Sequence, residues 1–261
     1  MHALKRPWGV LHYAVTGPED GPAVVFANSL GTDLRLWDAL LPLLPAGLRL
    51  IRYDKRGHGL SENGPADGID GLAEDAIALI EEVARQPVVF VGLSIGGLIA
   101  QRVAALRPDL LRGLVLSNTA AKLGTAESWT ARIDAVRANG MASIAPVVME
   151  RWFAPAFLSR PERALWQRMM ERTDPEGYVG ACRALAGADL TESTRALRLP
   201  TLVIGGGADG ASPPEVVEAT ARLIEGVAFH LIPDTGHLPP VEAPRAMADL
   251  LNPFLQRISH V

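Results

Sequence analysis

Short apolar runs alternate with segments of helical spacing along most of this chain, and this alternation restricts its fold more than any other feature. Runs rich in Val, Ile, Leu and Ala span residues 23–27, 48–53, 88–91, 114–116 and 201–204. Continuous apolar runs of this length are typical of strands buried on both faces of a sheet. Apolar residues recur at helical spacing over residues 72–83, and we expect Glu74 and Asp75 in the first turn of that helix. Strands that alternate with helices predict a parallel sheet.

The alternation lapses between residues 121 and 189, where only stretches of helical spacing are found, such as the one that contains Trp129 and Ile133. A helical insert in an alternating chain predicts a cap over the sheet. We therefore predict an α/β core made of residues 1–120 and 190–261, with a helical cap at residues 121–189. The cap is rich in Met and Trp, which can build adaptable pocket walls, although packing between helices explains most of them.

Composition narrows the class of protein. With 261 residues, 48% of them hydrophobic and 21% charged, the chain can form one large domain or one domain with an inserted cap. A formal net charge of −4 and the lack of a Lys/Arg block argue against nucleic acid or an anionic membrane as a partner. No stretch approaches the roughly 20 apolar residues of a membrane span, and we expect a cytoplasmic protein. The single cysteine, Cys182, cannot form an internal disulfide or a Cys-based metal cluster, and no metal site is expected.

The strongest local signal is a G-x-S-x-G pattern, Gly92 to Gly96, between a predicted strand at residues 86–93 and a predicted helix at residues 97–106. In this strand–turn–helix context the turn is so tight that the serine adopts a strained backbone conformation. The flanking glycines avoid the collisions that a Cβ would cause. Ser94 is therefore the predicted nucleophile, and the alternative is a glycine-rich turn whose serine has no chemical role.

A serine hydroxyl is a weak nucleophile at neutral pH, so a base must take its proton and a third group must orient that base. His237 follows a predicted strand at residues 227–232, in a loop that should open at the same sheet edge as Ser94. The other histidines lie inside predicted strands, near the termini, or at His58 in a loop better explained by support of the fold. His237 is the predicted general base, and the alternative is a hydrogen-bonded loop histidine.

The acid is expected in the loop after the predicted strand at residues 201–204, where Asp209 could reach the far nitrogen of His237. Asp234 is nearer to His237 in sequence, but a turn-forming role explains it well. The end of the preceding strand offers only Asn118, which carries no charge. Asp209 is therefore the predicted acid.

Acyl transfer also needs hydrogen-bond donors for the oxyanion of the tetrahedral intermediate. One is typically the backbone N–H after the nucleophile, which here belongs to Ile95. The second should come from the loop after an early strand, residues 28–31, where Leu30 is the best candidate.

With these residues in place, nearly the whole chain resembles the α/β-hydrolase superfamily and, more narrowly, the 3-oxoadipate enol-lactonases. The general motifs are residues 52–59 with Ser61, the pattern around Ser94, and residues 236–238. The motifs that look like the enol-lactonase subgroup are residues 28–32, residues 117–125 with Trp129 and Arg132, and residues 173–178. The resemblance implies an α/β-hydrolase fold: a mostly parallel eight-stranded sheet flanked by helices, with a helical cap inserted after the sixth strand.

The resemblance also implies an activity, the opening of 3-oxoadipate enol-lactone to 3-oxoadipate in the β-ketoadipate pathway of aromatic-compound degradation. Such a reaction requires no cofactor, and the expected partner is the small-molecule lactone itself. The substrate's carboxylate requires a positive or hydrogen-bonding partner in the cap. The candidates for the binding wall there are Lys122, Trp129 and Arg132. Arg132 could pair with a carboxylate through two hydrogen bonds, but an exposed arginine on a solvated helix face fits equally well.

Several alternatives use the same three catalytic residues. A general carboxylesterase would act on a different acyl group, and a cofactor-free haloperoxidase or perhydrolase would use peroxide. A ligand-binding receptor on a hydrolase fold is the non-enzymatic alternative, and an intact set of Ser94, Asp209 and His237 argues against it. The oligomeric state stays open, a homo-oligomer included.

Overall fold

The computed structural model describes every residue of the chain except 66, 259 and 261. Its centre is an eight-stranded sheet in the order β1-β2-β4-β3-β5-β6-β7-β8. The strands are β1 His2–Arg6, β2 Gly9–Thr16, β3 Ala23–Ala27, β4 Arg49–Tyr53, β5 Val88–Leu93, β6 Leu111–Ser117, β7 Thr201–Gly206 and β8 Phe229–Ile232. β1 and β2 pair antiparallel, as do β2 and β4, and all other neighbours are parallel. The prediction of a mostly parallel eight-stranded sheet is confirmed.

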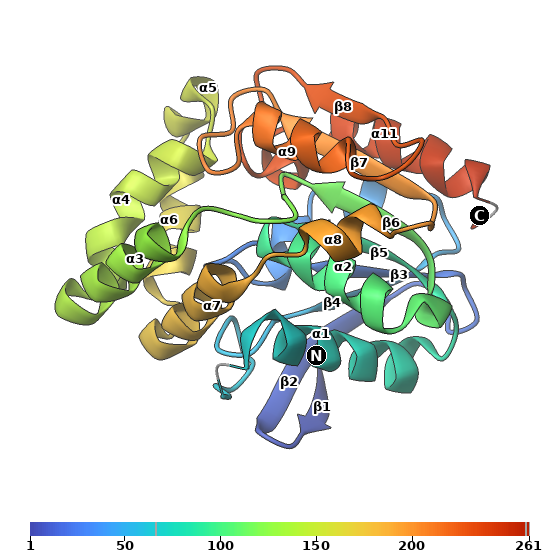
Figure 1. Cartoon of the computed structure of the whole chain (residues 1–261), viewed down its shortest axis with the longest axis horizontal. Coiled ribbons are helices and arrows are strands. Elements are labelled where there is room, and N and C mark those ends of the chain that lie inside the picture. The colour runs from blue at the N-terminus through green and yellow to red at the C-terminus, as the bar shows by residue number, and fades with distance from the viewer. Residues whose placement is uncertain (66, 259, 261) are drawn as a thin grey trace.

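Helices of the core pack around this sheet, and a second group of helices lies to one side of it (Figure 1). The core helices are α1 Gly68–Leu79, α2 Ile95–Leu106, α8 Thr191–Arg195, α9 Pro214–Ala221, α10 Pro239–Glu242 and α11 Pro244–Arg257. The inserted helices, between β6 and α8, are α3 Ala126–Asn139, α4 Met141–Trp152, α5 Pro155–Leu158, α6 Arg163–Glu171 and α7 Pro175–Gly187. The predicted helical insertion after the sixth strand is confirmed, and its exact limits at residues 121 and 189 stay a prediction.

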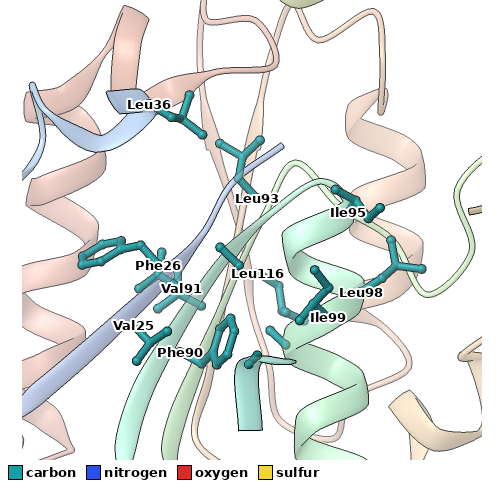
Figure 2. Close-up of a cluster of buried hydrophobic side chains, with 14 of the residues drawn as sticks. Val25, Phe26, Leu36, Phe90, Val91, Leu93, Ile95, Leu98, Ile99 and Leu116 are labelled. Carbon is teal, nitrogen blue, oxygen red and sulfur yellow. The ribbon is translucent and has the colours of Figure 1, made fainter. Parts of the chain in front are cut away.

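The core lies where the central strands meet α2. Every residue of β3 and β5 is buried, as the continuous apolar runs predicted. Phe26 and Val91 pair across these two strands, and Leu98 and Ile99 of α2 pack nearby (Figure 2). Each such side chain contributes about 1.5–3 kcal/mol on burial. This packing fixes the position of the strand–helix turn that carries Ser94.

The first helix differs from the sequence prediction. It begins at Gly68, a full turn before residue 72, so Glu74 and Asp75 lie in its interior instead of its first turn. Asp75 is 1% exposed and accepts hydrogen bonds from the Nε atoms of Arg6 and Arg56, at 2.9 and 2.7 Å. Asp75 is therefore a buried ion-pair partner that ties β1 and the β4 loop to this helix. The helix ends in a π-helical turn, Ile80–Ala84.

Among the residues that the structure describes, no helix combines the length and apolarity needed to cross a membrane.

Candidate active site

Ser94 lies in the sharp turn between β5 and α2. Its φ of 57° and ψ of −121° fall in a region that L-residues rarely adopt, as the sequence pattern predicted. A Cβ on Gly92 would lie 2.2 Å from the carbonyl oxygen of Gly96, and one on Gly96 would lie 2.1 Å from that of Ala27. The glycines are therefore required by close backbone contacts, and the tight turn places the Ser94 side chain at the N-terminus of α2.

His237 and Asp209 meet in the loops that follow β8 and β7. His237 Nδ1 lies 2.9 Å from Asp209 Oδ2, and both side chains are buried. Burial alone would raise the pKa of Asp209, but the charge of His237 and the hydrogen bonds from His237, Asn118 and Ser212 outweigh it and hold this pKa below its ordinary value. Asp209 is therefore ionised near neutral pH. An ionised Asp209 favours the tautomer with a proton on His237 Nδ1, and in that tautomer Nε2 can accept a proton. Asp234, by contrast, is an exposed turn residue with a φ of 51°.

Two supporting residues were missed by the sequence analysis. Asn118 Nδ2 donates to Asp209 Oδ2 at 2.8 Å and to the carbonyl oxygen of Gly236 at 3.2 Å, so one amide joins the acid to the histidine loop. Ser212 Oγ lies 3.1 Å from His237 Nδ1 and donates to the carbonyl oxygen of Asn118 at 2.7 Å. The sequence analysis dismissed Asn118 because it is uncharged. An amide can nevertheless donate a hydrogen bond to a carboxylate, and asparagine tolerates the positive φ of 48° found there.

A second serine contacts the histidine directly. Ser29 Oγ lies 3.3 Å from His237 Nε2, and Ser29 is 1% exposed. Ser94 lines the same cavity as His237, but within the described part of the chain its hydroxyl forms no hydrogen bond with the imidazole. His237 Nε2 is thus hydrogen-bonded to Ser29.

The backbone N–H groups of Leu30 and Ile95 are the predicted oxyanion donors; Leu30 lines the cavity, and Ile95 directly follows Ser94, which also lines it. Neither is engaged in a hydrogen bond with any of the residues described by the structure. Gly31, next to Leu30, has a φ of 73° and packs against the inserted helices, where a Cβ would lie 3.3 Å from the ring of Tyr178. Asn28 holds the other end of the loop, because its Nδ2 donates to the carbonyl oxygen of Tyr53 at 3.0 Å.

A cavity of about 160 Å³ lies between the sheet edge and the inserted helices. The core contributes Ser29, Leu30, Ser94, Ala211, Ser212 and His237, and the insertion contributes Leu123, Gly124, Ser128, Trp129, Arg132, Val148, Arg151, Trp152 and Tyr178. This volume is below the roughly 300–1,000 Å³ of pockets for drug-sized ligands, so it favours a small substrate.

The three cap residues expected at the substrate are placed differently. Trp129 and Arg132 line the cavity, and Arg132 Nη1 donates to the hydroxyl of Tyr178 at 3.3 Å. Lys122 does not line it; its side chain is exposed and forms an ion pair of 3.1 Å with Asp189. The reason is that Lys122 lies on the surface of the connection before α3, although it belongs to the same sequence motif.

Arg151, which the sequence analysis did not select, also reaches the cavity wall. It is an exposed residue at the end of α4, and its Nε donates to the carbonyl oxygen of Gly210 at 2.9 Å. Within the described residues, neither Arg132 nor Arg151 pairs with a carboxylate. The cavity therefore carries positive charge that no side chain at its wall neutralises.

The insertion is tied to both loops that carry His237 and Asp209. The carbonyl oxygen of Trp152 accepts a hydrogen bond of 2.6 Å from the backbone N–H of His237. Glu242 bridges the two parts, since its oxygens accept from the backbone N–H groups of Ala154 and Gly236, each at 2.9 Å. Burial raises the pKa of Glu242 to about 7, although these two hydrogen bonds oppose the rise. The end of α4 and the histidine loop thus form one unit.

No metal-binding group of His, Cys, Asp and Glu side chains occurs among the described residues.

Comparison with known proteins gives a consistent assignment. The family described as "Alpha/beta hydrolase family" matches residues 24–250. The 3-oxoadipate enol-lactonase 1 of Acinetobacter baylyi is 33% identical over 255 residues, which cover 97% of this chain and 96% of that protein. The crystal structure of the enol-lactonase from Burkholderia xenovorans has a TM-score of 0.91 at 34% identity, with 95% and 96% of the two chains covered. The malate-bound structure of a thermophilic esterase from Thermogutta terrifontis has a TM-score of 0.92 at 30% identity and covers 100% of both chains. With the strained serine turn and the His237–Asp209 pair described above, these similarities show that the chain is a serine hydrolase that belongs to the alpha/beta hydrolase family.

Proposed function

We propose that this protein opens 3-oxoadipate enol-lactone to 3-oxoadipate, with Ser94 as nucleophile, His237 as general base and Asp209 as the carboxylate that orients the base. One observation carries the choice of substrate. The small cavity that holds Ser94 and His237 is also lined by Arg132, whose charge no neighbouring carboxylate neutralises within the described residues. A small lactone with a free carboxylate matches both the size and the charge of that cavity.

Ser94 is a better nucleophile than Ser29, although Ser29 is the serine that is hydrogen-bonded to His237 Nε2. The turn at Ser94 is strained and glycine-flanked, and the hydroxyl lies at the N-terminus of α2, whose dipole favours a developing negative charge. The next backbone N–H, that of Ile95, is free to receive an oxyanion. In this mechanism the Ser94 hydroxyl donates to His237 Nε2 in place of Ser29.

The reaction then proceeds by acyl transfer. His237 Nε2 takes the Ser94 proton as Oγ attacks the lactone carbonyl, and the N–H groups of Leu30 and Ile95 hold the oxyanion. Each donor of this kind is typically worth about 3 kcal/mol. Collapse of the intermediate breaks the ring C–O bond, and the imidazolium returns the proton to the departing enol oxygen. The enol becomes a ketone, and a water molecule deprotonated by His237 hydrolyses the acyl-enzyme to the second carboxylate.

Arg132 is the proposed partner of the substrate's carboxylate, with Trp129 as the adjacent apolar wall. A guanidinium can bind a carboxylate through two parallel hydrogen bonds, which fixes the orientation of the lactone as well as its affinity. Arg151, exposed at the same wall, supplies additional positive charge. The similarity to two enol-lactonases at 33% and 34% identity over nearly the full length supports the same substrate, and with it a role in aromatic-compound degradation.

A general carboxylesterase is the second candidate. The full-length similarity to the Thermogutta terrifontis esterase favours it, and so does a cavity that would also admit small neutral esters. The two functions differ in one respect, which is whether the substrate's own carboxylate is needed for efficient turnover.

The deciding experiment compares kcat/KM for freshly generated 3-oxoadipate enol-lactone, followed by loss of ultraviolet absorbance, with kcat/KM for a panel of small neutral esters. The proposal expects the lactone to be preferred by at least about tenfold, the smallest effect expected from a charge-assisted hydrogen bond. Efficient ester hydrolysis without turnover of the lactone would replace the lactonase proposal with the esterase.

A further inference from the structure

Lys55 is a buried lysine that the proposed reaction does not use. It follows β4, and it is 3% exposed. Its Nζ donates to the carbonyl oxygen of Ser29 at 2.6 Å and lies 3.5 Å from that of Thr32. Asp54 and Asp33 exert a favourable charge effect on it, but within the described residues no carboxylate comes close enough to form an ion pair. Within the described residues, the Nζ atom of Lys55 therefore contacts only backbone carbonyl oxygens of one loop.

Such a placement is unfavourable for stability alone. Burial lowers the pKa of Lys55 to about 7, against the opposing charges of Asp54 and Asp33. An apolar side chain of similar length would avoid this penalty. A buried lysine with no ion-pair partner is retained at a cost in stability, which points to a role in the chemistry of the loop that it contacts.

The loop is the one that holds the proposed oxyanion donor. The carbonyl oxygen of Ser29 and the N–H of Leu30 belong to the same peptide group. This group is planar, and in the trans form its C=O and N–H point in opposite directions. A cation bonded to the oxygen of a peptide draws electron density away from its nitrogen, so the N–H on the other side becomes a stronger donor. A protonated Lys55 can therefore influence the Leu30 N–H although Lys55 does not line the cavity.

We propose that Lys55 is a positioning residue that fixes and polarises the Ser29–Leu30 peptide, so that the Leu30 N–H binds the oxyanion more strongly than an unassisted backbone donor would. The proposal rests on the proposed function in one respect, which is that Leu30 donates to the oxyanion. Because the negative charge develops only in the transition state, Lys55 should affect kcat and not the binding of the neutral carbonyl of the substrate.

The shape of the loop does not depend on Lys55 alone. The carbonyl oxygen of Ser29 also accepts hydrogen bonds from the Thr32 hydroxyl at 2.9 Å and from the Thr32 backbone N–H at 3.4 Å. Asn28 holds the loop from the other end, through its bonds to Tyr53 and Trp37. Lys55→Gln should leave this turn in place and remove the charge, whereas Lys55→Met removes the charge together with the hydrogen bond to Ser29. The electrostatic role can therefore be tested apart from folding.

The test uses the full chain with Lys55→Met, which keeps the length of the side chain, and Lys55→Gln, which keeps a neutral donor. Lys122→Met is the matched control, because Lys122 is exposed and outside the cavity. Four quantities are measured: kcat and KM for the preferred substrate, the inhibition constant of butylboronic acid, and the inhibition constant of 3-oxoadipate. The boronic acid forms a tetrahedral adduct with the serine and imitates the oxyanion, whereas the product does not.

We expect Lys55→Met to lower kcat on the order of tenfold and to raise the inhibition constant of butylboronic acid by a similar factor. The values for Lys55→Gln should lie between those of Lys55→Met and wild type. This is less than the roughly 10²–10³-fold loss on complete removal of an oxyanion donor. KM and the 3-oxoadipate constant should change by no more than about twofold, as for Lys122→Met. If Lys55→Met does not fold, the comparison of Lys55→Gln with wild type decides alone.

Two results would overturn the proposal. One is kcat and boronic acid affinity within about twofold of wild type in both Lys55 variants. The other is an equal loss of affinity for the boronic acid, the product and the substrate, which would show that the whole site has become less ordered. If the wild-type enzyme does not turn over the lactone but hydrolyses esters, only the lactonase proposal is contradicted. The ratios of variant to wild-type kcat and inhibition constant can then be measured with the best ester.

Discussion

Ser29 Oγ lies 3.3 Å from His237 Nε2, so the nitrogen that must receive the nucleophile's proton is hydrogen-bonded to a serine other than the proposed nucleophile. The proposed nucleophile, Ser94, lines the same cavity from the strained turn after β5. The two hydroxyls would compete for one nitrogen. This competition makes the identity of the nucleophile a question that labelling can answer.

A fluorophosphonate should modify Ser94 and leave Ser29 unmodified, because only Ser94 combines a strained turn with the N-terminus of a long helix. Peptide mapping by mass spectrometry locates the adduct. In Ser29→Ala the label should still be found on the peptide that contains residue 94, since the remaining serine has unobstructed access to His237. An adduct on residue 29 of the wild type would reverse the assignment.

Arg132→Met should raise KM for the enol-lactone by roughly 10–100-fold, because a hydrogen bond to a charged group is worth about 1.5–3 kcal/mol. Hydrolysis of a small neutral ester should change little, since that substrate has no carboxylate. Lys122→Met serves as the control, because Lys122 pairs with Asp189 on the surface and should leave both activities unchanged. Equal losses on ester and lactone would mean that Arg132 supports the cap instead of the substrate.

Asn118→Ala should lower both stability and kcat. It removes the donor that holds Asp209 and Gly236 together, and it leaves a non-glycine residue at a φ of 48° without the side-chain bonds that compensate for it. The expected loss in the free energy of unfolding is about 1–3 kcal/mol, typical of a buried polar group left without its partner. Urea denaturation gives this energy, and steady-state kinetics gives kcat. A variant with unchanged kcat would show that Asp209 and His237 stay aligned without Asn118.

Glu242 should give the protein a component of stability that declines as pH rises. Its folded pKa of about 7 lies above the ordinary 4.5, so between these values the folded state binds more protons than the unfolded state. The contribution is fully present below about pH 4.5 and is lost as pH rises through about 7; because the carboxyl is partly exposed, solvent screening keeps the loss below the roughly 3 kcal/mol that the two pKa values alone would give. The difference between the Tm values at pH 5 and pH 8 should therefore be smaller for Glu242→Gln than for the wild type. The same pH difference in both proteins would show that Glu242 does not titrate in this range.

Much of the fold could be predicted because its determinants are local. The run at residues 23–27 coincides with β3, since five consecutive apolar residues suit a strand buried on both faces. The loops of Ser94, Asp209 and His237 could be placed at one edge because each follows a parallel strand, and the carboxyl ends of such strands share an edge.

The parts that could not be predicted depend on contacts between distant segments. Asp75 looked like a helix-start acid, yet it is buried against Arg6 and Arg56, whose positions only the folded chain defines. Asn118 has no charge to mark it, and its role depends on how the β6 and β7 loops meet. Lys122 shares a motif with residues at the cavity, but a motif does not specify which side of the chain faces inward.

The central claim is that Ser94 opens the enol-lactone. Its most direct test is the rate of absorbance loss of 3-oxoadipate enol-lactone with wild type, Ser94→Ala and Ser29→Ala at equal concentration. The account predicts turnover by wild type, a loss of at least about 10⁴-fold in kcat for Ser94→Ala, and retention of turnover by Ser29→Ala within about tenfold. Turnover that survives in Ser94→Ala and disappears in Ser29→Ala would contradict it.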